Sequence, residues 1–322
     1  MDELHKFLFD GLPVRGMLVR LEASWQDVLK RRDPACGGKG SFPAPVRRLL
    51  GEMAAASVLM QSNIKFNGAL ILQVQGDGPV RLAVAESQPD LAFRVTASVQ
   101  GEVPPEAGLE AMLNVHGQGR CAITLDPKDR LPGQQPYQGI VPLHGDRREP
   151  LQQLAQVLEH YMLQSEQLDT RLALAADDRV AAGLLIQRLP LEGQGNLGLA
   201  RHEDGTGASE DFNRIAHLAA SVTRDELLAL DADTLLRRLF WQEPLLRQAL
   251  FEPRFACSCS RERVRSMLQG LGRDEVQGIL AERGNVEIGC EFCGRHFLFD
   301  AVDVGGMFKP AVDRPPGSGA VN

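Results

Sequence analysis

Four of the six cysteines of this 322-residue chain lie close together near its C-terminal end. Cys257 and Cys259 are separated by one residue and Cys290 and Cys293 by two, and residues 260–289 lie between the two pairs. Each pair can present two sulfur atoms to one ion, and the insert is long enough to fold back so that the pairs meet. The spacing therefore predicts a tetrahedral metal site with four thiolate ligands.

Zinc is the metal that this spacing favours, with one Zn²⁺ per chain. An iron–sulfur cluster also accepts four thiolates, but two separated pairs suit zinc better. His296 could replace one thiolate as a ligand. Because four cysteines are available, we interpret His296 as a surface residue or a neighbour of the ligands.

The same thiols could serve as a redox device. Two thiols in a C-x-C sequence lie close enough to form a disulfide, and C-x-x-C is a common redox pair. Oxidation would remove metal ligands, and structural zinc contributes on the order of 10 to 16 kcal/mol to the folding of small zinc modules. The spacing alone leaves both a permanent structural zinc site and a redox switch open.

The residues around the cysteines predict a small unit with few core residues. Residues 260–272 and 273–284 have helical patterns that end at glycines, and 285–299 reads as a strand, a turn and a strand. Most of the apolar residues available for a core are Val264, Met267, Leu268, Leu271, Val276, Ile279, Leu280 and Phe297. Such a unit would depend on its metal for stability.

The longer N-terminal part of the chain has the pattern of an α+β domain. Apolar and polar residues alternate with a period of two from about residue 64 to 145, and helical spacing flanks this region. We expect helices at 45–61 and 149–165, a hairpin at 68–87, and strands at 91–101, 119–126, 137–143, 170–177 and 181–190. The sheet should be mostly antiparallel, with the helices packed against it.

Four segments follow from these patterns. Residues 1–190 form the α+β core domain, and 191–250 form a helical linker that begins with a Gly-rich, charged stretch. Residues 251–308 form the cysteine-containing, zinc-binding domain. The Pro-, Gly- and Ser-rich residues 309–322 are expected to be a disordered tail.

Charge and composition exclude several classes of protein. The formal net charge is −7, and Lys and Arg are interleaved with acidic residues, which argues against a nucleic-acid binder. We interpret basic pairs such as Arg47–Arg48 and Arg237–Arg238 as solvated helix faces. The sequence has no secretory signal and no apolar run that could span a membrane, so we expect a cytoplasmic protein without membrane contact.

No motif in the chain supports an enzyme. Gly193, Gly195 and Gly198 spell G-x-G-x-x-G, but the sequence after them continues as a loop, whereas a dinucleotide site needs a helix there and a parallel βαβ unit. The sequence contains no G-x-S-x-G, H-E-x-x-H or GK[ST] motif. A zinc-containing transcription regulator is disfavoured by the acidic charge.

The chain resembles the redox-regulated 33-kDa heat-shock chaperones of bacteria. The family's hallmark is C-x-C, an insert of this length and C-x-x-C, which stands here as Cys257-Ser-Cys259 and Cys290-Glu-Phe-Cys293. Further family-like segments are "LHKFLFDGLPVRG", "LQVQGDGPVRLAV", "YMLQSEQLDTRL" and "AAGLLIQRLP", in the family's order. The resemblance covers nearly the whole chain.

The resemblance implies a holdase chaperone that is inactive while reduced and zinc-bound. Oxidation would join Cys257 to Cys259 and Cys290 to Cys293, release zinc, unfold the C-terminal domain and destabilise the linker. Apolar surface would then bind unfolding client proteins, in a homodimer, before their transfer to ATP-dependent foldases. The alternative is a constitutive protein-binding module with a purely structural zinc site. Cys121 is interpreted as a core residue, and no role is predicted for Cys36.

Overall fold

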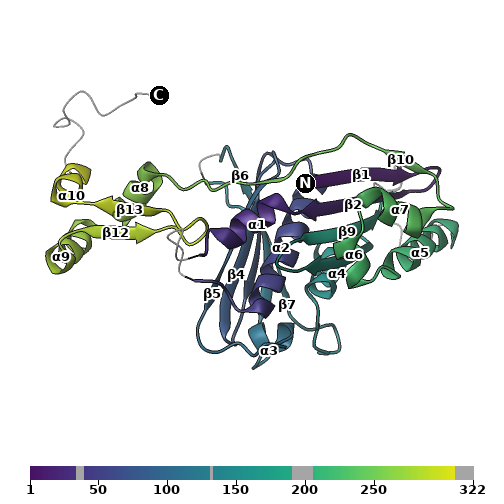
Figure 1. Ribbon diagram of the computed structural model, residues 1–322, viewed down its shortest axis with the longest axis horizontal. Coiled ribbons are helices and arrows are strands. Elements are labelled where there is room, and N and C mark those ends of the chain that lie inside the picture. Colours follow the sequence, from purple (N-terminus) through teal and green to yellow (C-terminus); the bar gives the residue numbers. More distant parts are fainter. Residues whose placement is uncertain (34–39, 131–132, 191–205, 309–322) are drawn as a thin grey trace. The chain divides into compact units, whose positions relative to one another are not determined.

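The structure, a computed structural model, describes residues 1–33, 40–130, 133–190 and 206–308 (Figure 1). The chain divides into two compact units. We call Met1–Lys30 with Ser41–Ala256 the core unit, and Arg31–Gly40 with Cys257–Asn322 the cysteine unit. The expected tail at 309–322, Cys36 and the G-x-G-x-x-G glycines lie outside the described residues.

Two sheets form the core unit, and every strand pair but one is antiparallel. The five-stranded sheet has the order β10 (Leu245–Arg247), β1 (Glu3–Phe9), β2 (Val14–Leu21), β9 (Ala181–Arg188), β8 (Thr170–Ala176). The six-stranded sheet has the order β11 (Arg254–Phe255), β5 (Ala92–Val99), β4 (Val80–Ser87), β3 (Gly68–Gln75), β6 (Arg120–Pro127), β7 (Tyr137–Pro142). The exception is β11, which pairs with β5 in parallel.

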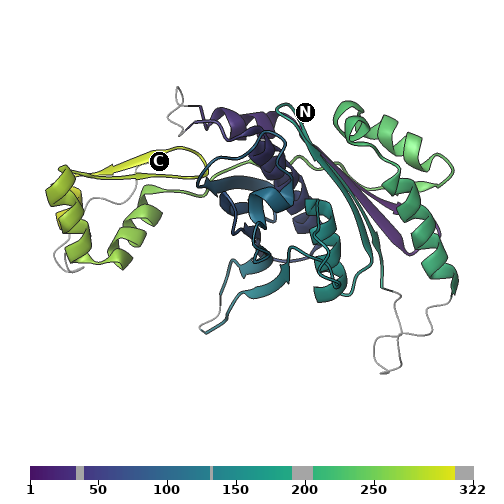
Figure 2. The ribbon, with the colours of Figure 1, turned by 90° about the horizontal axis from the view of Figure 1, so that it is seen from below.

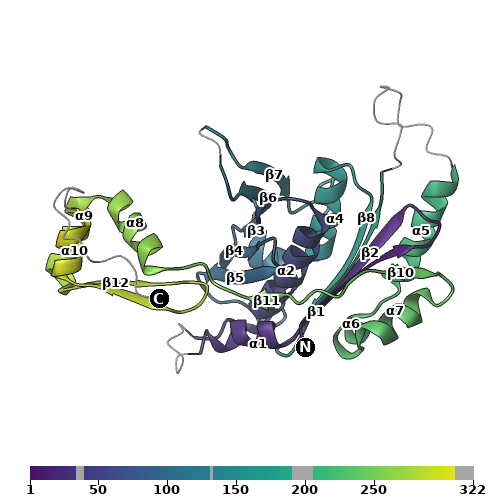
Figure 3. The ribbon, with the colours of Figure 1, turned by 90° about the horizontal axis from the view of Figure 1, so that it is seen from above.

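Helix α2 (Ala44–Asn63) packs against both sheets and carries much of the main core (Figure 3). It buries residues along almost its whole length because strands flank it on two sides. Gly51 allows the closest approach, since a Cβ atom there would lie 2.4 Å from the Cβ of Ala176. The remaining helices before the linker are α1 (Ala23–Lys30), α3 (Leu109–Leu113) and α4 (Leu154–Ser165).

The linker helices cover the other face of the five-stranded sheet (Figure 2). They are α5 (Thr206–Ala220), α6 (Arg224–Ala229) and α7 (Ala232–Phe240). Helix α6 begins with a reciprocal cap in which the Thr223 hydroxyl accepts from the Glu226 N–H and the Glu226 carboxylate accepts from the Thr223 N–H. A second hydrophobic cluster joins these helices to the sheet and contains Phe7, Phe9, Leu18, Ile186, Phe212, Ile215, Leu235, Leu236, Leu239 and Phe240, among others.

The cysteine unit contains α8 (Arg261–Leu271), α9 (Arg273–Arg283), the hairpin β12 (Val286–Gly289) and β13 (His296–Phe299), and α10 (Ala301–Met307). Its core consists of Leu268, Val276, Val286, Phe297, Phe299, Val304 and Met307. The predicted fold class is confirmed: antiparallel sheets with packed helices, helices in the linker, and a small C-terminal unit around four cysteines.

Candidate metal centre

The four predicted cysteines come together in the cysteine unit. Their Sγ atoms all lie within 4.8 Å of one another. Cys257 Sγ lies 3.6 Å from Cys290 Sγ, and Cys259 Sγ lies 3.3 Å from Cys293 Sγ. Four thiolates about 2.3 Å from a tetrahedral zinc ion would stand about 3.8 Å from one another. The cluster therefore has the size and the donor atoms of a site that can hold one metal ion.

The first pair is positioned by the start of a helix. Cys259 precedes Ser260, the N-cap of α8, whose hydroxyl accepts a hydrogen bond from the Arg263 N–H at 3.2 Å. The Ser260 carbonyl accepts the Val264 N–H at 3.1 Å. These bonds fix the backbone next to Cys259.

The second pair lies in the turn between β12 and β13. The Cys290 N–H donates to the Arg295 carbonyl at 2.8 Å, and the Gly294 N–H donates to the Cys290 carbonyl at 2.9 Å. Gly294 has a φ of 71°, a left-handed conformation that glycine adopts without strain. The turn therefore directs two sulfur atoms that are three positions apart to the same side.

The surroundings of the sulfurs favour a bound cation over free thiolates. Burial, followed by the hydrogen bonds with Cys293 and Cys257, raises the pKa of the Cys259 thiol to about 12. The hydrogen bond with Cys257, followed by burial, raises the pKa of Cys290. Thiolates this close repel one another unless a cation lies among them. Metal binding at this cluster would therefore displace protons from the sulfurs.

The cluster is continuous with the small core of the unit. Cys293 is buried, and Cys259 and Cys290 pack against the hydrophobic cluster of Leu268, Val286 and their neighbours. Oxidation of the sulfurs or loss of a bound metal therefore acts directly on the packing of the residues that form the core of the unit.

The other candidate residues are not part of this cluster. Nδ1 of His296 lies 2.7 Å from Glu287 Oε1 on the neighbouring strand, and the cluster identified within the described ranges consists of the four cysteines alone. Cys121 is fully buried in β6, as the sequence predicted, and burial raises its pKa to about 12. None of the five cysteines in the described ranges is in a disulfide.

Within the described residues, no helix combines the length and the apolar character that a membrane span requires.

Glu52, Arg48 and Arg224 form a second polar site, in the core unit. Sequence reasoning missed it, because residues so distant along the chain leave no local motif.

Comparisons with known proteins agree with one another. Residues 2–300 match the protein family described as Hsp33 protein. The 33 kDa chaperonin of Chromobacterium violaceum is 44% identical over 310 residues, covering 95% of this chain and 94% of the relative. The 33 kDa chaperonin of Methylobacillus flagellatus is 40% identical over 315 residues, covering 98% and 97% of the two chains. The crystal structure of the 33 kDa chaperonin of Thermotoga maritima matches with a TM-score of 0.73 at 20% identity, over 95% of this chain and 97% of that one.

Proposed function

Since this chain belongs to the Hsp33 protein family of chaperones, we propose that it is a redox-regulated holdase, inactive while its four clustered cysteines are reduced and hold one Zn²⁺. Cys257, Cys259, Cys290 and Cys293 are the proposed zinc ligands. Bound zinc would supply a cross-link between the two cysteine pairs.

The observation that carries this proposal is the position of the sulfurs in so small a unit. All four Sγ atoms lie within 4.8 Å, and two of the cysteines pack against a core of seven buried side chains. A core of this size supplies only a few kcal/mol, so a unit of this kind needs a cross-link to stay folded. The thiols that hold the ion are thus also the groups on which folding of the unit depends.

Oxidation of these thiols is the proposed trigger. Peroxide accepts two electrons from the two thiolates of each pair and two protons from the solvent, so that one S–S bond forms and two molecules of water leave. The proposed bonds are Cys257–Cys259 and Cys290–Cys293. A disulfide sulfur is a far weaker metal ligand than a thiolate, so two disulfides leave no ligand set for the ion and the cysteine unit loses its cross-link.

The structure supports a specific client-binding surface. Helices α5 to α7 bury the outer face of the five-stranded sheet, which presents Phe7, Phe9, Val14, Leu18, Leu184 and Ile186. If unfolding of the cysteine unit destabilises the linker, this contiguous apolar face becomes available. Such a face suits unfolding polypeptides, because they expose apolar side chains themselves.

The remaining parts of the proposal follow from the family. The segments 1–190, 191–250 and 251–308 act as chaperone core, linker and zinc-dependent switch. The oxidised protein works as a homodimer in the cytoplasm, passes its clients to ATP-dependent foldases, catalyses no reaction of its own and binds neither nucleic acid nor membrane.

Light scattering of an aggregating client protein tests the proposal. The full chain is added either reduced and zinc-loaded or after peroxide treatment at mildly raised temperature, and released zinc is measured with a chromogenic chelator. Suppression of aggregation only by the oxidised sample, with loss of one zinc per chain, is expected. Equal suppression by both samples would indicate a constitutive binding module with a structural zinc site.

A further inference from the structure

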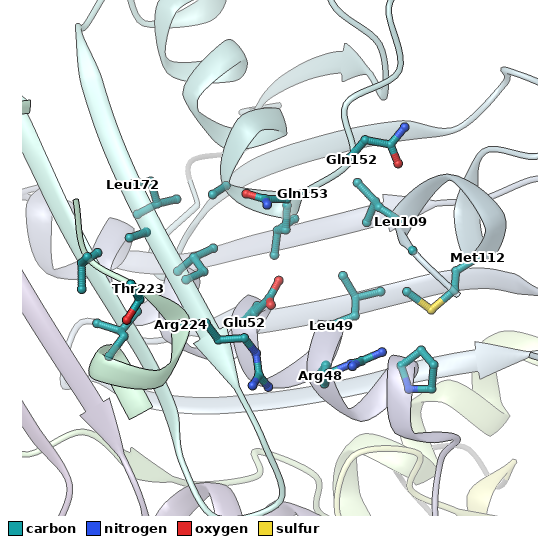
Figure 4. A pocket seen from close by; sticks show the side chains of 18 of the residues that line it. Arg48, Leu49, Glu52, Leu109, Met112, Gln152, Gln153, Leu172, Thr223 and Arg224 are labelled. Carbon is teal, nitrogen blue, oxygen red and sulfur yellow. The ribbon is translucent and has the colours of Figure 1, made fainter. Parts of the chain in front are cut away.

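A pocket of the core unit lies at the linker helices (Figure 4). Its volume is about 420 Å³. Small-molecule sites commonly have volumes of about 300 to 1,000 Å³. Helix α2, β8, the N-terminal ends of α3 and α4, and the start of α6 contribute its walls. The pocket is separate from the cysteines, since every residue that lines it belongs to the core unit.

The charged groups of the pocket are mostly basic. Arg48 of α2, Arg171 of β8 and Arg224 of α6 line it, and Glu52 is the one carboxylate among the lining residues. Arg171 is paired with Glu159 at 3.4 Å, and Arg224 donates to the Ala176 carbonyl at 2.6 Å.

Arg48 is the least engaged of these cations. Among the described residues it makes no hydrogen bond and no ion pair, and its interaction in the pocket is the longer-range attraction to Glu52. Sequence reasoning assigned Arg47 and Arg48 together to a solvated helix face. The structure separates them, because Arg47 pairs with Asp178 on the surface whereas Arg48 faces the pocket.

Glu52 points into the pocket, and the side chains of Arg224 and Arg48 extend on either side of it (Figure 4). Burial raises the pKa of Glu52 to about 7, against the opposing effect of Arg224 and then Arg48. Near neutral pH a large fraction of this carboxyl therefore carries a proton. In that form it can donate a hydrogen bond to an acceptor placed between the two arginines.

The rest of the lining is apolar. It consists largely of Leu49, Leu109, Met112, Leu154, Leu172 and Leu227. An apolar wall beside a small group of convergent polar side chains is the usual make-up of a site for a small organic ligand.

We propose that this pocket binds a small amphipathic anion, with its acidic head group held between Arg48 and Arg224 and its apolar body against the leucines. The head group accepts hydrogen bonds from both guanidinium groups and from the protonated Glu52 carboxyl, so binding takes up a proton. Carboxylate and phosphate head groups both have this chemistry.

The position of the pocket gives this ligand a consequence for regulation, which rests on the proposed function. Val222, Thr223, Arg224 and Leu227 come from the linker, whereas the opposite walls belong to the core domain. A ligand that contacts both walls stabilises the docked linker and so opposes activation.

Isothermal titration calorimetry of the reduced, zinc-loaded full chain tests the binding. The probes are octanoate and octyl phosphate, with octan-1-ol and octylammonium as controls for the apolar tail alone. Titration at pH 7 in two buffers of different ionisation enthalpy measures proton uptake. We expect one saturable site per chain for an acidic probe, and the better of the two probes identifies the head group.

Substitutions locate the site. Arg48→Gln and Arg224→Gln should each weaken binding roughly tenfold or more, because each removes a charge-assisted hydrogen bond. Glu52→Gln should keep most of the affinity and lose the proton uptake, since the amide mimics the protonated carboxyl. Arg237→Gln, on the exposed side of α7, should change nothing. If Arg224→Gln does not fold, Arg48→Gln decides alone.

Three outcomes would overturn the proposal: no saturable binding of either acidic probe, equal binding of octan-1-ol, or unchanged affinity in Arg48→Gln. The assay uses reduced protein and no client. Failure of binding therefore leaves the redox switch standing, and failure of the redox switch leaves the ligand site standing.

Discussion

The Sγ atoms of Cys259 and Cys293, which are 34 positions apart along the chain, lie 3.3 Å from each other. The distance between Cys257 Sγ and Cys290 Sγ is 3.6 Å. These two contacts join one cysteine pair to the other. This arrangement suits a metal ion shared by the two pairs. It also means that oxidation could join cysteines of different pairs as well as cysteines of the same pair.

Oxidation in solution should nevertheless yield Cys257–Cys259 and Cys290–Cys293. Partners within a pair stay one or two residues apart when the unit unfolds, whereas partners from different pairs separate with the flexible insert between them. Peptide mapping of peroxide-treated, non-reduced protein by mass spectrometry checks this. Detection of Cys259–Cys293 as the main product would show that the cysteine unit is oxidised while still folded.

Removal of a single cysteine should weaken zinc binding strongly. If about 10 to 16 kcal/mol of binding free energy is shared by four ligands, each thiolate contributes roughly 2 to 4 kcal/mol, which corresponds to about thirtyfold or more in affinity. A Cys→Ser variant at Cys257, Cys259, Cys290 or Cys293 should show this loss of zinc affinity in competition with a chromogenic chelator. Cys121→Ser is the matched control, because that thiol is buried in β6 and lies outside the cluster.

Tight, stoichiometric zinc in all four serine variants would remove the basis of the ligand assignment. The circular dichroism spectrum of each variant should also show partial unfolding, since Cys259 and Cys290 pack against the core of the cysteine unit.

Much of the fold could be predicted because the patterns are local. Alternation around Gly76–Pro79 predicted the hairpin that the structure shows as β3 and β4. The helical linker predicted for 191–250 is shown by the structure as α5, α6 and α7 in its described part. The proximity of the four cysteines could also be predicted from their spacing, because two cysteine pairs separated by an insert that can fold back are typical of a metal site with four thiolate ligands.

Other features could not be predicted because they depend on contacts between distant segments. Apolar and polar residues do not alternate regularly in β1 and β2, so the sequence pattern does not identify them as strands. The structure shows them as strands because β1 pairs with β10 and β2, and β2 pairs with β9. Glu52 and Arg224 are brought together only by docking of the linker. A sequence window contains one or the other, and each by itself looks like an ordinary charged residue on a helix.

The stability of the core unit should fall between about pH 4.5 and pH 7. The pKa of Glu52 rises from 4.5 to about 7 on folding, so the folded chain keeps a proton that the unfolded chain has lost. The stabilisation that this proton provides is about 3 kcal/mol and is complete below the pKa that Glu52 has in the unfolded chain. It disappears as the pH rises through the pKa that Glu52 has in the folded chain.

Urea denaturation of the reduced protein measures this effect. Glu52→Gln cannot ionise, so it should be more stable than the unmodified protein at pH 8 and similar to it at pH 5. Glu210→Gln, at an exposed position of α5, serves as control. A gain in stability that is the same at both pH values would mean that ionisation of Glu52 is not the cause.

Loosening the linker should activate the chaperone without oxidation. Leu236 of α7 is 1% exposed and packs in the cluster that joins the linker helices to the five-stranded sheet. Leu236→Ala should cost roughly 2 to 5 kcal/mol of this packing and raise the population in which the sheet face with Phe7 and Phe9 is uncovered. The reduced, zinc-loaded variant should then suppress client aggregation in part, whereas Arg237→Ala, on the solvent side of the same helix, should remain inactive. A Leu236→Ala protein with a destabilised linker and no activity would place the client-binding surface elsewhere than on this sheet face, because uncovering the face would then have no effect on clients.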